Sequence, residues 1–120
     1  MPEFVPVCKL DDLPAASAKH VRVDGRELAV ARVAGGECYA IGGRCSHLRA
    51  ALGRGELDGT TLTCPWHGSQ FDVSNGRLLR WVQEPWWVRI GASLIPSFLR
   101  RGVASYEVKI EDGQVLVKLD

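Results

Sequence analysis

The chain has 120 residues, of which 15 are basic and 14 acidic, so its formal net charge is +1. This length is typical of one domain with a modest core, and we expect a single domain over residues 1–120. The balanced charge lacks the overall positive excess that is typical of nucleic-acid-binding domains. No apolar run reaches the roughly 18 residues that a membrane-spanning helix needs.

In chain order, short apolar or alternating runs are separated by glycine turns, a pattern typical of an all-β protein. The expected strands are 4–8, 20–23, 27–33, 37–41, 60–63, 70–73, 77–79, 106–110 and 114–119. Asp24-Gly25 and Asp112-Gly113 predict tight hairpin turns. Residues 11–18 predict a short helical turn, which Pro14 prevents from extending. The pattern alone therefore predicts a small β-sandwich or barrel.

Two short segments each carry one cysteine and one histidine, Cys45-Ser46-His47 and Cys64-Pro65-Trp66-His67. This mixed thiolate–imidazole set can bind one metal centre only if the fold brings the two segments together. A structural zinc site is the alternative, because zinc also takes two cysteines and two histidines. Zinc fingers usually place like ligands next to each other, whereas the ligands here alternate along the chain.

The order C-x-H…C-x-x-H resembles the Rieske [2Fe–2S] signature, in which two histidines replace two cysteines on one of the irons. The run CPWHGSQFD, which begins at Cys64, strengthens this resemblance. The resemblance implies one cluster per chain, with Cys45 and Cys64 on one iron and His47 and His67 on the other.

The resemblance covers residues 1–80 and 104–120. It implies a Rieske domain of stacked antiparallel β-sheets, in which residues 42–73 form an inserted cluster-binding subdomain. Residues 81–103 depart from the family pattern, which has a short proline-bearing loop here, and they contain three of the four tryptophans. We expect these residues to form an ordered flap beside the cluster; a partner-binding patch and a shallow membrane contact are the alternatives.

Branches of the family are separated by features that this chain lacks. Quinol-oxidising relatives have an extra cysteine in each ligand loop, where this chain has Ala50 and Trp66. Terminal oxygenases carry a mononuclear iron bound by two further histidines, and here only His20 remains.

The resemblance thus implies a ferredoxin without activity of its own, similar to the ferredoxin components of bacterial ring-hydroxylating dioxygenases. It would carry one electron from a flavoprotein reductase to a terminal oxygenase or other reductase. The alternatives are the small Rieske subunit of an NAD(P)H nitrite reductase and a protein whose cluster serves redox sensing or structure.

Other residues of the second loop have implied roles around the cluster. Ser69 matches a serine that donates a hydrogen bond to a bridging sulfide in high-potential relatives, whereas Phe71 replaces their tyrosine donor and is expected to pack in the core. Pro65 and Gly68 shape the backbone, and Trp66 packs over the cluster or fills the space of the absent disulfide. With one donor instead of two, the midpoint potential is expected toward the low end of the Rieske range of about −150 to +300 mV.

Arg44, Arg49 and Arg54 predict a basic rim that steers an acidic partner, the alternative being ordinary solvated charges. Cys8 and Cys38 are expected to be small buried strand residues and not a disulfide. The first residues lack the features of a secretion signal, so a cytoplasmic location is the expectation.

Overall fold

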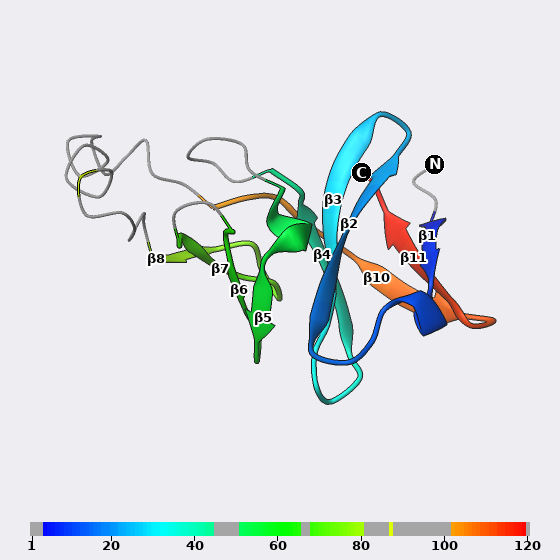
Figure 1. The fold of residues 1–120 in the computed structure, drawn as a ribbon. Helices are drawn as coiled ribbons and strands as arrows, with labels where there is room; N and C mark the ends of the chain where they lie inside the picture. Colours follow the sequence, from blue (N-terminus) through cyan, green and yellow to red (C-terminus); the bar gives the residue numbers. More distant parts are fainter. Residues whose placement is uncertain (1–3, 45–50, 66–67, 81–86, 88–101, 120) are drawn as a thin grey trace.

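The computed structural model describes residues 4–44, 51–65, 68–80, 87 and 102–119, which form three antiparallel sheets (Figure 1). The first sheet has the order β1-β11-β10, the second β2-β3-β4-β9 and the third β5-β6-β7-β8. The strands are β1 (Phe4–Lys9), β2 (Ser17–Val23), β3 (Arg26–Arg32), β4 (Cys38–Gly42), β5 (Glu56–Asp58), β6 (Thr61–Thr63), β7 (Gln70–Asp72), β8 (Leu78–Arg80), β9 (Ser105–Tyr106), β10 (Val108–Glu111) and β11 (Gln114–Lys118). Two single-turn 3₁₀-helices, η1 (Leu10–Asp12) and η2 (Leu52–Arg54), complete the described part. The predicted all-β class is confirmed, and no helix in the described part is long and apolar enough to cross a membrane.

The turns at Asp24-Gly25 and Asp112-Gly113 form where they were predicted. Asp24 and Gly25 have φ values of 50° and 78°, and Asp112 and Gly113 have 52° and 74°. Positive φ at both central residues matches the right-handed twist of the flanking strands, and Asp and Gly tolerate it best. These turns close the β2–β3 and β10–β11 hairpins.

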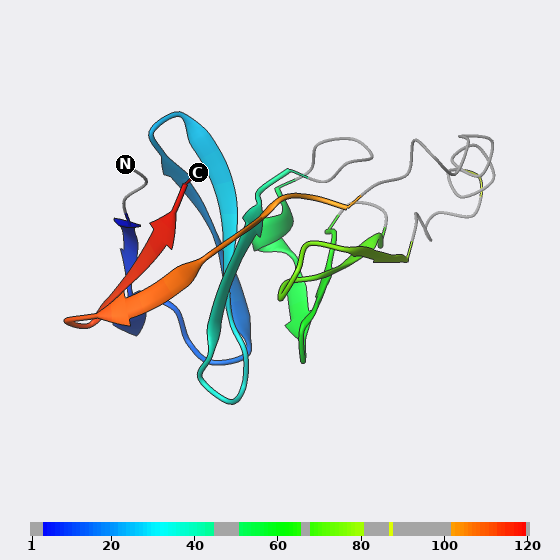
Figure 2. The same cartoon turned by 180° about the vertical axis from the view of Figure 1, so that it is seen from behind.

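Strand β3 is buried on both faces and separates two apolar cores. Its successive side chains point to opposite faces of the sheet. Leu28 and Val30 pack in one core with residues of β11, whereas Ala29 and Ala31 pack in the other with residues of β6 and β7. The β2-β3-β4-β9 sheet therefore lies between the other two sheets, an arrangement visible from both sides of the molecule (Figures 1 and 2).

The prediction of one strand over residues 106–110 is wrong, because this stretch belongs to two sheets. Tyr106 pairs with Ala40 of β4, whereas Val108 pairs with Val117 of β11. At the crossing, the carbonyl of Glu107 accepts a hydrogen bond from Lys118 N at 2.9 Å. The chain thus changes sheets within one extended segment, as strands do at the corners of packed sheets.

Two other details differ from the sequence prediction. The helical turn expected over residues 11–18 is limited to η1, and Ser17 already begins β2. Strand β5 was not predicted, because its three residues are too short to show a period of two. Cys8 and Cys38 lie in β1 and β4 as free, half-buried thiols without a disulfide, and burial raises the pKa of both.

The third sheet extends past residue 73, the predicted end of the cluster-binding subdomain, and its last strand ends at Arg80. The predicted flap, residues 81–103, lies outside the described residues except for Trp87, which is 63% exposed, and for Gly102 and Val103. Val103 N donates to Gly76 O at 2.8 Å, and Gly42 N donates to Ala104 O at 2.8 Å. The chain therefore returns between the third sheet and β4.

Replacing Gly76 by alanine is expected to destabilise this junction by at least about 1–2 kcal/mol, the usual cost of left-handed backbone for a residue with a Cβ. Gly76 has a φ of +77°, and a Cβ there would lie 2.1 Å from Val103 O. Gly113→Ala is the matched control, because Gly113 has a φ of +74° but no atom within 4 Å of its Cβ position. Chemical denaturation should show a larger loss for Gly76→Ala; equal losses would contradict the close approach.

Candidate metal centre

Of the four predicted ligands, only Cys64 belongs to the described residues; Cys45, His47 and His67 lie outside them. Cys64 directly follows β6 and is 4% exposed. It packs in the same core as Leu52. In the part of the chain that the structure describes, no other three His, Cys, Asp or Glu side chains gather as a metal site. The motif therefore remains the candidate centre.

The second ligand loop is the connection of the β6–β7 hairpin. Thr63 pairs with Gln70, and inside this pair Cys64 N donates to Ser69 O at 2.7 Å. Gly68 N donates to Cys64 O at 3.2 Å, and Gly68 has a φ of +79°, which glycine adopts without steric cost. Two backbone hydrogen bonds therefore hold the base of the loop together around Cys64.

The base of the first ligand loop is also closed by backbone contacts. Arg44 and Ala51, the residues on either side of the loop, form an isolated antiparallel bridge. Leu52 N donates to Gly43 O at 2.9 Å, and Gly43 N donates to Glu27 O of β3 at 2.9 Å. The entry and exit of this loop are therefore held next to each other where β4 ends, beside the start of β3.

The exit of the first loop lies against the entry of the second. A Cβ on Gly55 would lie only 1.9 Å from Thr63 O, so the chain after η2 touches the residue that precedes Cys64. Leu52 of η2, Cys64 and Phe71 share one apolar core. The fold thus brings the bases of the two loops together, which a joint centre with ligands from both loops requires.

Ser69 has the surroundings expected beside a buried acceptor. It is 1% exposed, and its Oγ has no hydrogen-bond partner among the described residues. A buried hydroxyl without a partner costs about 1–3 kcal/mol, so such groups are normally satisfied. A sulfide of an iron–sulfur cluster is an acceptor of the required kind, and a buried thiol at Cys64 suits iron. The burial of Cys64 and Ser69 therefore fits the [2Fe–2S] cluster that the motif implies.

Other residues of this loop are placed as follows. Phe71 is fully buried in the core, as predicted from its lack of a hydroxyl. Pro65 is exposed, and Trp66 lies outside the described residues.

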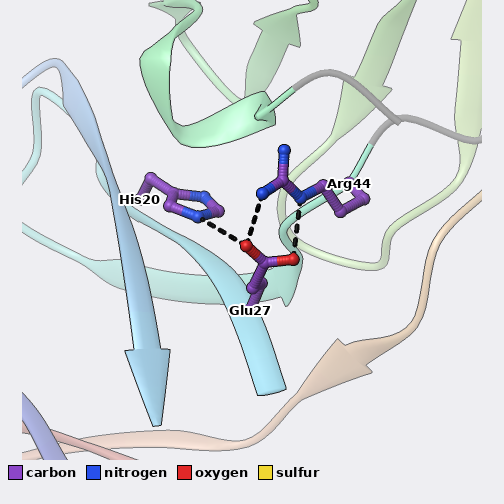
Figure 3. A network of polar contacts seen from close by, with 3 residues as sticks. All are labelled: His20, Glu27 and Arg44. Carbon is purple, nitrogen blue, oxygen red and sulfur yellow. Dashed lines mark hydrogen bonds and ion pairs between the residues drawn. The ribbon is translucent and has the colours of Figure 1, made fainter. Parts of the chain in front are cut away.

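A network of three charged or polar side chains lies where the first loop begins (Figure 3). Arg44 Nε donates to Glu27 Oε2 at 2.8 Å, and a terminal guanidinium nitrogen of Arg44 donates to Glu27 Oε1. His20 Nε2 lies 3.4 Å from the same Oε1. The hydrogen bonds from Arg44 lower the pKa of Glu27 to about 2, although partial burial opposes this, and they raise the pKa of Arg44.

Sequence reasoning did not find Glu27 or His20 in this role. Glu27 is 17 residues away from Arg44 along the chain, and only the pairing of β3 with β4 brings them together. Of the residues predicted to form a basic rim, Arg44 is thus ion-paired with Glu27, Arg54 is exposed at the end of η2, and Arg49 lies outside the described residues. The docking role of these arginines stays a prediction.

The Glu27 ion pair should make stability depend on pH in the acid range. Because the pKa falls from its ordinary 4.5 to about 2 on folding, the pair stabilises the protein above pH 4.5, and this contribution is lost as the pH falls through 2. In urea titrations, Glu27→Gln should unfold more easily than the wild type at pH 6, and the gap should shrink between pH 4.5 and 2. A gap that stays constant over this range would contradict the assignment.

Comparison with known proteins agrees with this geometry. Residues 3–98 match the family model of the Rieske [2Fe-2S] domain. The ferredoxin component of the naphthalene 1,2-dioxygenase/salicylate 5-hydroxylase systems of Ralstonia sp. is 33% identical over 92% of this chain and 90% of its own length.

Solved structures show the same similarity. The ferredoxin of carbazole 1,9a-dioxygenase from Nocardioides aromaticivorans IC177 has a TM-score of 0.76 at 28% identity and covers 98% of each chain. A chain from the complex of reduced oxygenase and oxidized ferredoxin in carbazole 1,9a-dioxygenase has a TM-score of 0.70 at 30% identity, with 94% of this chain and 99% of that chain covered. The chain therefore belongs to the Rieske [2Fe-2S] domain family, and these relatives, which it matches along nearly their whole length, are ferredoxins.

Proposed function

We propose that this chain is a one-electron carrier, the ferredoxin component of a multicomponent dioxygenase system. The observation that carries the proposal is the match over 98% of both chains to the carbazole 1,9a-dioxygenase ferredoxin. The match covers nearly the whole length of that carrier. Of its three histidines, two belong to the motif, and the third, His20, contacts Glu27, so the chain lacks the histidines of a mononuclear iron site.

One [2Fe–2S] cluster per chain is held in this proposal by Cys45, His47, Cys64 and His67. When bound, the cluster accepts and releases one electron at a time. Two thiolates and two neutral imidazoles compensate the formal +2 charge of the oxidised Fe₂S₂ core, so the oxidised site is neutral. Adding an electron to a neutral site costs less than adding it to the −2 site that four thiolates would make, which explains the choice of ligands.

Backbone hydrogen bonds orient Cys64, and the side chains around it exclude water. The two backbone hydrogen bonds at the base of the second loop hold Cys64 in place, and its burial among Leu62 and Phe71 keeps solvent from the sulfur. The buried Ser69 Oγ, which has no partner among the described residues, would donate a hydrogen bond to the cluster and stabilise added negative charge. Pro65 and Gly68 shape the backbone in this proposal, and Trp66 covers the cluster.

The partners follow from the same relatives. The oxygenase and the ferredoxin of carbazole 1,9a-dioxygenase form a complex in a solved structure. For this chain we infer a terminal oxygenase as acceptor and a flavoprotein reductase as donor, both in the cytoplasm where NAD(P)H is available.

The exposed Arg54 is part of the basic rim through which the chain would meet an acidic face of its partner. Arg54→Glu should slow reduction by the partner reductase by roughly threefold or more at low ionic strength, and salt should reduce the difference. Lys9→Glu is the matched control, because Lys9 is exposed on β1 in the first sheet. Equal rates for Arg54→Glu and the wild type at low ionic strength would exclude steering by this arginine.

Reconstitution tests the function as a whole. The purified holo-protein is added to the reductase and terminal oxygenase of a naphthalene-type dioxygenase, and NADH-dependent product formation is measured. Product formation that depends on this chain supports the proposal. Oxygenation by the isolated chain with reductant alone, or a cluster that neither accepts nor delivers electrons, would contradict it.

A further inference from the structure

The β2–β3 hairpin, which belongs to the second sheet and not to the sheet that carries Cys64, holds the start of the first ligand loop. Glu27 of β3 contributes twice to this contact. Its carbonyl accepts a hydrogen bond from Gly43 N at 2.9 Å, and its carboxylate accepts two from the guanidinium of Arg44. Arg44 directly precedes Cys45 in the chain. Glu27 therefore binds both the backbone of Gly43 and the side chain of Arg44 at the entry to the loop.

The close approach at this point depends on glycine. A Cβ on Gly43 would lie 2.7 Å from Leu28 N and 2.9 Å from Glu27 O, closer than real side chains come to a backbone. The two parallel hydrogen bonds between the Arg44 guanidinium and the Glu27 carboxylate fix the orientation of the two groups as well as their distance. Both features restrict how the chain enters the loop.

The exit of the loop rests on the same hairpin. A Cβ on Gly53 of η2 would lie 2.4 Å from His20 N, so the turn that follows the loop packs directly on the backbone of β2. The imidazole of His20 in turn lies 3.4 Å from Glu27 Oε1 (Figure 3). His20 and Glu27 thus connect the two ends of one ligand loop.

We propose that Glu27, supported by His20, is a positioning residue of the iron–sulfur site that holds the first ligand loop ready for the cluster and offsets the positive charge of Arg44 beside Cys45. This inference rests on the proposed ligand set, since it assigns Cys45 to the cluster. It goes beyond that set because neither Glu27 nor His20 belongs to the binding motif. Partners that orient metal ligands commonly change metal affinity by about 10–100-fold when they are replaced.

Replacing Glu27 and replacing Arg44 should shift the midpoint potential in opposite directions, which a purely structural ion pair would not do. Removing the carboxylate takes away the negative charge that faces Arg44 beside a ligand, which favours the reduced cluster and raises the midpoint potential. Removing the guanidinium takes away a positive charge beside the same ligand and lowers the midpoint potential. Both changes weaken the attachment of the loop, so both should speed loss of the cluster.

The test compares Glu27→Gln, Arg44→Gln and Arg44→Lys in the holo-protein, with Glu111→Gln as the control. Glu111 is also an ion-paired glutamate, 3.2 Å from Lys109, but it lies on β10 in the first sheet. Midpoint potential is measured by film voltammetry, and cluster loss to an iron chelator is followed by visible absorbance. Iron and sulfide content of the wild type is determined first.

We expect Glu27→Gln to raise the potential and Arg44→Gln to lower it, with about tenfold faster cluster loss in both. Arg44→Lys keeps the charge but cannot form two parallel bonds, so it should keep the potential and still lose the cluster faster. If Glu27→Gln and Glu111→Gln have the same midpoint potential and lose the cluster at the same rate, the role of Glu27 is overturned, but the proposed function is not. A wild-type protein that lacks iron and sulfide would overturn the proposed function, and the inference with it.

Discussion

Replacing Cys64 by serine is expected to remove the iron–sulfur cluster, with iron and inorganic sulfide falling from about two each per chain to background. A serine hydroxyl is a weak iron ligand near neutral pH because it keeps its proton. The side chain is only 4% exposed, so no water enters easily to replace the sulfur. The visible absorption and the EPR signal of the reduced protein should disappear together.

Cys38→Ser is the matched control for this change. Cys38 is a half-buried cysteine that lies in β4 and packs against the core between the first and second sheets. This variant should keep its full iron and sulfide content. A Cys64→Ser protein that retains the cluster, or equal losses in the two variants, would remove Cys64 from the ligand set.

Replacing Ser69 by alanine is expected to lower the midpoint potential of the cluster by on the order of 60–130 mV. A hydrogen bond to a charged group contributes about 1.5–3 kcal/mol, and for a one-electron couple about 1.4 kcal/mol corresponds to about 59 mV. Ser69 is 1% exposed, and its Oγ has no partner among the described residues, so its donor is available to the cluster. The hydrogen bond strengthens when the cluster gains negative charge, and its loss therefore disfavours reduction.

Ser74→Ala is the control for this measurement, because Ser74 is exposed in the turn after β7 and its Oγ donates to Asp72 Oδ1 at 2.6 Å. Its potential should equal that of the wild type. Phe71 cannot supply a second donor, so the wild-type potential itself should lie toward the low end of the range from about −150 to +300 mV. A wild-type value well above about +150 mV, or no shift in Ser69→Ala, would contradict this account of the potential.

The parts of the fold that depend on local backbone preference were predictable from the sequence. Asp24-Gly25 and Asp112-Gly113 sit in turns that require positive φ, and this requirement is visible in two residues. Parts that depend on tertiary partners were not predictable in the same way. Tyr106 and Val108 continue one alternating pattern, yet they pair with different sheets, and nothing local marks the crossing at Glu107.

The same distinction applies to the site. The family signature predicts the ligands because their residue types and spacing are local features of two short loops. Glu27 carries no such signal, because an isolated glutamate after a hairpin turn is usually a solvated surface residue. Its contact with Arg44 exists only because β3 and β4 pair, and it changes how an arginine predicted for docking is understood. The predicted flap over residues 81–103 stays a prediction.

The most direct test of the central claim is metal and sulfide analysis of the anaerobically purified chain, combined with a redox titration followed by EPR. We expect iron and inorganic sulfide in equal amounts, about two of each per chain, and an EPR signal that appears on uptake of one electron. Equimolar zinc without iron or sulfide would contradict it and would make the Cys–His motif a structural zinc site.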